Sequence, residues 1–110
     1  MMFKGDKMYS IIYITTSGIS ESKKIAQILL EKKLAACINI IPSIESVYLW
    51  KGEVEEDSES IMVVKTRSNF VEKLIKMVED IHSYEIPCIL EISVNSGSDN
   101  YLKWIDSELN

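Results

Sequence analysis

Two side chains in this 110-residue sequence could together bind a soft metal ion. Cys37 offers a thiolate, and His82, the only histidine, offers an imidazole. This pair favours copper or zinc over calcium or magnesium, because sulfur and nitrogen donors suit the later transition metals. Two ligands do not complete a shell, so Glu85, Glu91, water or another subunit would have to contribute. The alternative is structural: His82 ends a predicted helix, where a cation is favourable, and Cys37 fills a gap in the core.

A second set of residues could line a cleft between subunits for a small planar or anionic ligand. Its aromatic members offer flat apolar surfaces, and its lysine offers a positive charge. Because tyrosine and tryptophan are also enriched at protein interfaces, packing between subunits is the alternative role. The set consists of Tyr48, Trp50, Lys65, Tyr84, Glu85 and Trp104.

The sequence lacks the motifs of nucleotide-binding and hydrolytic enzymes. It contains neither GxGxxG nor GxxxxGK[ST], and it has no GxSxG nucleophile elbow. The acidic run between residues 53 and 59 lacks the spacing and the glycine of an EF-hand loop, so we interpret it as a solvated hairpin tip. We therefore expect no enzymatic activity and no obligatory cofactor.

The composition is that of a folded globular protein, with 46% hydrophobic and 26% charged residues. A formal charge of -5 without a basic stripe argues against a nucleic-acid partner. No apolar run approaches the roughly 20 residues that cross a bilayer, and the first residues lack the apolar core of a signal peptide. We expect a cytoplasmic location, where Cys37 and Cys88 stay unpaired.

Hydrophobic periodicity predicts the elements that must position these side chains. A strand is expected over residues 9–16. A helix capped by Ser20 should then run to about Lys33. The small and apolar residues 35–41 predict an interior strand, and Pro42 predicts a bend or bulge where that strand meets a hairpin.

The second half of the chain begins with this long hairpin, which turns at Lys51-Gly52. Asn69 and Glu72 are spaced like a capping box at the start of a second helix, which should end near His82. The remaining elements are a strand over residues 88–94 and a short helix opened by Ser98 or Asp99. The order strand, helix, strand, strand, helix, strand predicts an α+β ferredoxin-like sheet, a split βαββαβ sandwich, with an extra C-terminal helix.

The hairpin strands carry apolar side chains on both faces. Val47 and Leu49 point one way, whereas Tyr48 and Trp50 point the other. Two helices cover only one face of such a sheet, and an isolated two-stranded ribbon is marginal in water. We therefore expect an oligomer in which the open sheet faces meet and the hairpin reaches a neighbour.

Five segments, in order, resemble the CutA1 family of divalent-cation tolerance proteins. They are EKKLAACINIIP at 31–42, SVYLWKGEVEE at 46–56, VVKT at 63–66, HSYEIP at 82–87 and YLKWI at 101–105. From their composition, with Gly5, we interpret residues 1–7 as a flexible leader. The resemblance covers nearly everything after it and implies a single domain of this family over residues 8–110.

The same resemblance implies a homotrimer of ferredoxin-like subunits, similar in shape to the PII signalling proteins. It also implies tolerance of divalent metals and copper binding, with Cys37 and His82 as the proposed ligands. This chain has Ser83 where the family commonly has proline, and Ile81 where members often carry another histidine. The alternative function is a PII-like signalling or scaffold trimer that binds a metabolite or a partner protein in its inter-subunit clefts.

Overall fold

Strands and helices follow one another in the predicted order. The computed structural model describes residues 8–110, so the predicted leader of residues 1–7 lies outside the described residues. The elements are β1 (Tyr9–Thr16), α1 (Ile19–Glu31), β2 (Cys37–Trp50), β3 (Glu53–Arg67), a 3-10 turn (Ser68–Phe70), α2 (Val71–Ile81), β4 (Ile89–Ser93) and α3 (Asp99–Glu108).

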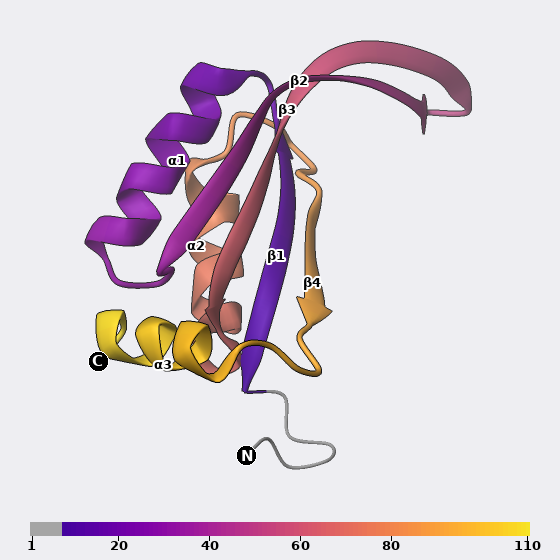
Figure 1. The fold of residues 1–110 in the computed structure, drawn as a ribbon. Helices are drawn as coiled ribbons and strands as arrows, with labels where there is room; N and C mark the ends of the chain where they lie inside the picture. Colours follow the sequence, from indigo (N-terminus) through magenta and orange to yellow (C-terminus); the bar gives the residue numbers. More distant parts are fainter. Residues whose placement is uncertain (1–7) are drawn as a thin grey trace.

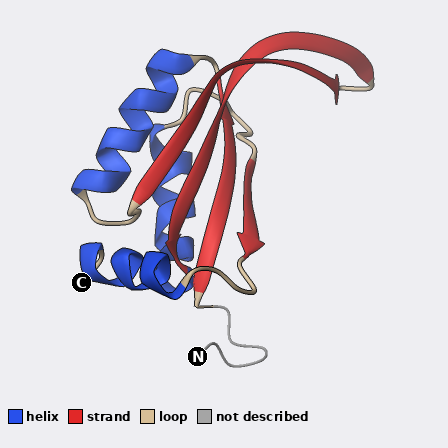
Figure 2. Cartoon of the chain, viewed as in Figure 1, coloured by secondary structure: helices blue, strands red, loops and turns tan. Residues whose placement is uncertain are grey.

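The four strands form one antiparallel sheet in the order β2-β3-β1-β4. Helices α1 and α2 lie on one face, and α3 crosses the foot of the sheet (Figure 1). Figure 2 shows the same layers by type of element, with all four strands on one side of the α1 and α2 pair. The α+β ferredoxin-like fold predicted from the sequence is confirmed.

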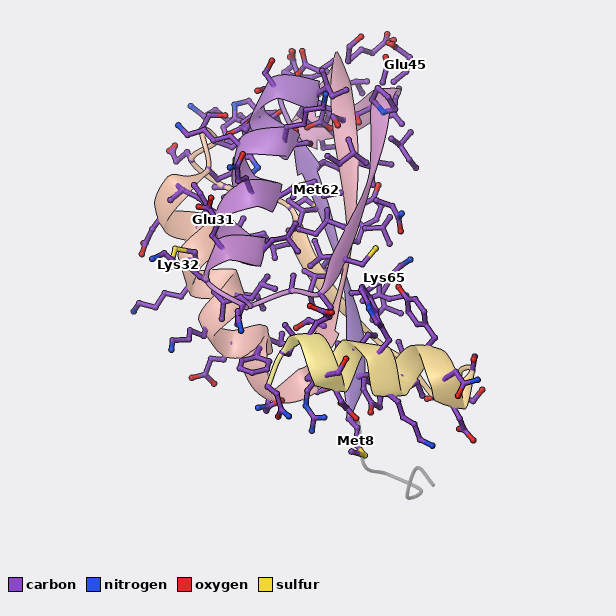
Figure 3. The ribbon with its side chains drawn as sticks, turned by 60° about the vertical axis from the view of Figure 1, so that its left-hand side comes forward. Met8, Glu31, Lys32, Glu45, Met62 and Lys65 are labelled. Carbon is purple, nitrogen blue, oxygen red and sulfur yellow. The ribbon has the colours of Figure 1, made fainter. Side chains whose placement is uncertain are left out.

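The core lies between the sheet and the two long helices. Strand residues Ile12, Ile14, Met62 and Val64 alternate along β1 and β3, and each is fully buried. The helices contribute the periodic residues that the sequence predicted, and Ile25, Leu29, Leu74 and Val78 are buried. In Figure 3, Met62 points toward the helix layer, whereas Lys65 points to the other side of the sheet. The two faces of the sheet are therefore distinct in this one subunit.

The face away from the helices remains largely apolar. Strand pairing places Ile11 beside Ile92 and Tyr13 beside Leu90 on this face, which we call the open face. Leu90 and Ile92 are 58% and 52% exposed. Ile41, in register with Ile61, adds a third exposed side chain at the β2 edge. The expectation that apolar residues point to both sides of the strands is confirmed.

The hairpin extends well beyond the sheet body and curves away from the helices (Figure 1). A register shift between Ile41 and Ile44 marks the irregularity predicted at Pro42. The turn residues Lys51 and Gly52 both adopt positive φ, 51° and 83°, as the tight turns of hairpins require. We call residues 44–59, beyond the shift, the hairpin arm.

Two predicted helix caps are wrong. Ser20 lies inside α1, whose N-cap is Gly18 and has no side-chain cap. Asn69 lies in the 3-10 turn before α2, and its side-chain oxygen accepts a hydrogen bond from Arg67 Nε instead of capping the helix. The cap predicted for the last helix is confirmed, because Ser98 Oγ accepts the Tyr101 N–H.

Helix α3 is fixed at the foot of the sheet by a polar contact from each of two strands. Asp106 accepts hydrogen bonds from the Tyr9 hydroxyl at 2.8 Å and from the Arg67 guanidinium. Ile105 and Leu109 are buried beneath it against Tyr9. Over residues 8–110, none of the helices has the length and apolar character needed to cross a membrane.

Candidate functional site

His82 is buried at the end of α2, and both of its ring nitrogens have partners. Nε2 lies 2.8 Å from the Thr15 carbonyl oxygen, and Nδ1 lies 3.0 Å from the Tyr84 backbone nitrogen. The carbonyl can only accept and the N–H can only donate, so Nε2 acts as the donor of the ring and Nδ1 as the acceptor. In this state His82 joins the end of β1 to the loop that follows α2.

Glu21, on the first turn of α1, holds that loop from the other side. Its carboxylate accepts the backbone N–H and the hydroxyl of Ser83, at 2.7 and 2.9 Å. It also accepts the N–H and hydroxyl of Ser17, at 3.0 and 2.8 Å. Burial alone would raise the pKa of Glu21, but these four hydrogen bonds outweigh it and lower the pKa to about 2. One Glu21 oxygen lies 3.8 Å from His82 Nδ1.

Tyr84 connects this loop to the hairpin. Its hydroxyl donates to Glu59 at 2.7 Å, and its ring packs on His82 with centroids 4.7 Å apart. Burial and the nearby Glu59 carboxylate raise the pKa of Tyr84 above its ordinary value. Tyr84 therefore stays a neutral donor to Glu59 at physiological pH.

Buried hydroxyl groups hold the base of the hairpin at Ser60, the residue that follows Glu59. Ser60 Oγ donates to the Ile41 carbonyl at 3.0 Å and accepts from Ser22 Oγ at 2.9 Å. Thr16 completes the chain, with its hydroxyl 2.7 Å from Ser22 Oγ. Because buried polar groups are costly unless paired, these contacts fix the point where the hairpin leaves the sheet.

Cys37 lies at the opposite end of the sheet from His82. It begins β2 in register with Lys65, which is itself in register with Ile11 of β1. His82 contacts Thr15, four residues further along β1, a separation of about 13 Å at the usual rise of a strand. Within one chain, then, the structure does not bring the two predicted metal ligands together. Cys37 is half-buried and, with Lys65, faces the open side of the sheet.

The predicted cleft residues fall into three places in one chain. Lys65 lies over the ring of Tyr101, 5.6 Å from its centroid, and Tyr101 packs against Trp104. Tyr48 and Trp50 lie on the hairpin arm, where the Tyr48 hydroxyl donates to Asp57. Tyr84 and the exposed Glu85 lie in the loop after α2. A single cleft containing all six would need more than one copy of the chain.

No group of three or more His, Cys, Asp or Glu side chains within residues 8–110 is placed to hold a metal ion. His82 Nδ1 and one Glu21 oxygen lie 3.8 Å apart. A pocket of about 570 Å³ lies elsewhere, at the foot of the sheet beside α3, and none of the predicted site residues line it.

Comparison with known proteins decides the family. The family model described as CutA1 divalent ion tolerance protein matches residues 10–108. The chain belongs to the CutA1 family. The divalent-cation tolerance protein CutA of Archaeoglobus fulgidus is 46% identical over 99 residues, which cover 90% of this chain and 96% of that protein. The chloroplastic protein CutA of Arabidopsis thaliana is 41% identical over 95 residues, 86% of this chain and 52% of the relative.

Solved CutA structures show the same fold. The structure described as the periplasmic divalent cation tolerance protein CutA from Archaeoglobus fulgidus superposes with a TM-score of 0.91 at 43% identity, covering 94% of this chain and all of that one. CutA1 from Oryza sativa gives 0.89 at 32% identity, with 96% of each chain covered. This chain spans about half the length of several curated relatives, including the mouse and human proteins.

Sequence reasoning missed Glu21, Glu59 and Ser60, which organise the His82 end of this CutA1 chain. Glu21 and Ser83 are 62 residues apart, and no local pattern connects them. The one available signal was the HSYE segment itself, because its histidine and tyrosine need hydrogen-bond partners once they leave water.

The low pKa of Glu21 predicts a pH dependence of stability. A carboxyl whose pKa is depressed on folding stabilises the native state above its unfolded pKa and loses that contribution as the pH falls through the folded value. We expect the free energy of unfolding to fall between about pH 4.5 and 2 more steeply in the wild type than in Glu21→Gln. Urea titrations at pH 7, 4.5, 3 and 2 measure this difference. Equal pH profiles for the two proteins would contradict it.

Proposed function

We propose that this chain acts as a homotrimeric divalent-cation tolerance protein that binds copper, or a similar divalent metal, through Cys37 and His82 of neighbouring copies. The family supplies the link to divalent cations, because its name and the names of the relatives carry it. The observation that carries the rest is the open face: it is apolar and includes Cys37, and α1 and α2 leave it uncovered, with α3 packing only at its foot in the described residues. No catalytic reaction is assigned to the assembly.

The apolar side chains that one subunit leaves exposed support the proposed assembly. Leu90, Ile92 and Ile41 are each about half exposed in one subunit, and the hairpin arm adds Val47, Leu49 and Val54 at 65%, 73% and 70% exposure. An apolar surface of this kind marks a protein interface. A closed ring of three copies lets each subunit offer the same open face and receive a neighbour's arm.

The ligand assignment requires His82 to give up one hydrogen bond. Nε2 bonds to a carbonyl within β1, whereas Nδ1 bonds to an N–H in the loop after α2. Loop segments rearrange at lower cost than paired strands, so Nδ1 is the nitrogen that we propose for the metal. Glu21 lies beside it as a second donor. Cys37 of another copy would supply the soft thiolate that favours copper or zinc.

The proposal also keeps a cytoplasmic location. Cys37 and Cys88 are both free and half-buried, as expected in a reducing compartment. Relatives differ in this respect, since one is described as chloroplastic and another as periplasmic.

Light scattering tests the assembly. The wild type should show three times the 12.6 kDa mass of one chain. Leu90→Glu, on the open face, should shift the mass toward that of one chain, because burying a carboxylate in an apolar interface is costly. The control is Leu30→Glu, which changes a residue of similar type and 41% exposure on α1. A wild type that stays folded at the mass of one chain would refute the trimer, and equal masses for the two variants would refute the open face as its interface.

Isothermal titration with copper tests the ligands. Combining Cys37→Ser with His82→Ala should abolish the site, because it removes both the thiolate and the imidazole. Cys88→Ser is the matched control, since Cys88 is also free and half-buried, and it should bind as the wild type does. Undiminished binding by the double variant would refute the assignment.

One observation favours the alternative, a PII-like trimer that binds a metabolite. Lys65 combines a positive charge with the stacked rings of Tyr101 and Trp104, which are 38% and 39% exposed. Charge beside an aromatic surface suits a small planar anion.

A thermal-shift screen of anionic metabolites in the presence of a chelator separates the two functions. Stabilisation by a metabolite that is lost in Lys65→Ala would favour the second function, because a ligand that binds only the native state raises the melting temperature. The control is Lys103→Ala, because Lys103 lies on α3 but outside the contact of Lys65 with the two aromatic rings. Stabilisation by copper alone would instead favour the first function.

A further inference from the structure

We propose that Tyr84 couples the His82 end of the sheet to the hairpin arm, with Glu21 as the positioning residue that holds the coupling segment in place. The part of this inference that involves copper rests on the proposed function. The mechanical part, by contrast, rests only on contacts within one chain.

A single side-chain hydrogen bond joins the hairpin arm to the rest of the described chain. Over residues 8–110, the hydrogen bond from the Tyr84 hydroxyl to Glu59 is the one side-chain hydrogen bond between residues 44–59 and any other part of the chain. Tyr48 bonds to Asp57 and Ser58 to Glu45, and these contacts stay within the arm. Loosening Tyr84 would therefore release Glu59 at the base of the arm, while the neighbouring Ser60 stays bonded to Ile41 and Ser22 and the strands of the arm stay paired.

Tyr84 is in turn placed by two neighbours in sequence. Its backbone N–H donates to His82 Nδ1 at 3.0 Å, so its position depends on that nitrogen being free to accept. Ser83, between them, is held through both its N–H and its hydroxyl by the Glu21 carboxylate. A serine at this position supplies both donors, whereas a proline would supply neither. The two hydrogen bonds from Ser83 to Glu21 therefore restrict this loop in the way that a proline ring would restrict it.

This arrangement makes a ligand at His82 Nδ1 and the Tyr84 N–H mutually exclusive. Nδ1 has one lone pair, so a cation bound there takes the acceptor away from the Tyr84 N–H. The segment must then shift, and the phenol on the same residue shifts with it. The predicted consequence is a looser Tyr84–Glu59 contact and a more mobile arm base when copper is bound.

Hydrogen exchange of the intact protein without metal tests the mechanical part. Peptides covering residues 41–46 and 56–62 should exchange about five-fold faster in Tyr84→Phe, the effect expected for one lost hydrogen bond. Tyr48→Phe is the matched control, because it removes a phenol bonded to a β3 carboxylate from inside the arm. It should leave the base unchanged. Peptides from the core of α1 report whether either variant is globally destabilised.

Two further variants test each end of the connection. Glu59→Gln turns the charged acceptor on the arm into a neutral amide oxygen, which accepts more weakly, and Glu21→Gln removes the carboxylate that holds Ser83. Each should accelerate exchange at the base of the arm. Glu31→Gln changes a carboxylate on the same helix that accepts a hydrogen bond from Gln27, away from the Ser83 loop, and should not accelerate it. Unchanged exchange at the base in both Tyr84→Phe and Glu59→Gln would overturn the coupling. Normal exchange in Glu21→Gln would overturn the role of Glu21.

Adding copper to the same proteins tests the regulatory part. Copper should accelerate exchange at the base in the wild type and add nothing in Tyr84→Phe. If calorimetry shows copper binding while exchange at the base stays the same, the regulation is refuted and the proposed function stands. If calorimetry shows no binding, the proposed function and the copper half of this inference both fail, and the metal-free variants still decide the mechanical coupling.

Discussion

The structure depends on one mismatch: the sheet has two apolar faces, and the chain has one layer of long helices. Burial of Ile12, Ile14, Met62 and Val64 under α1 and α2 removes the inner face from water. The same strands, with a period of two, necessarily place their other residues outward, and there Leu90 and Ile92 remain about half exposed. The proposed assembly and the proposed ligand role of Cys37 both follow from this face, because what covers it determines which groups of a neighbouring copy lie beside Cys37.

The His82 end of the sheet obeys a different constraint, the pairing of buried polar groups. Thr16, Ser22, Ser60 and His82 are all buried, and no buried side-chain nitrogen or oxygen of the described residues lacks a hydrogen-bond partner. A fully paired network is rigid, because moving one member leaves another unsatisfied in a poor dielectric. This explains why a histidine expected as a ligand also acts as a structural link. A ligand at His82 Nδ1 would compete with the hydrogen bond from the Tyr84 N–H. Binding there would therefore change contacts elsewhere in the fold.

Periodic patterns were enough to predict the elements and their faces, since each depends on residues two to four positions apart. The β1 limits, the irregularity after Pro42 and the inward stripe of α2 were all predictable in this way. The caps at Ser20 and Asn69 were not, because cap identity depends on where the first helical turn begins, and a 3-10 turn precedes α2. The site was harder still. Its contacts join residues 62 and 67 positions apart, and the distance from Cys37 to His82 depends on strand register, which the sequence does not state.

Charge explains how so exposed a hairpin arm remains compatible with an apolar interface. Residues 44–59 contain six carboxylates and one lysine, so the arm carries a formal charge equal to the -5 of the whole chain. Strand pairing places Glu53, Glu55, Asp57 and Glu59 on the face of Tyr48 and Trp50, and places Val47, Leu49 and Val54 on the other, together with Glu45 and Glu56. The face of Val47, Leu49 and Val54 therefore suits a neighbouring subunit. The four carboxylates on the face of Tyr48 and Trp50 stay hydrated and repel arms that meet out of register. In the proposed assembly, the acidic face ends at Glu59, which is where Tyr84 holds the arm, so the charge and the coupling meet at one residue.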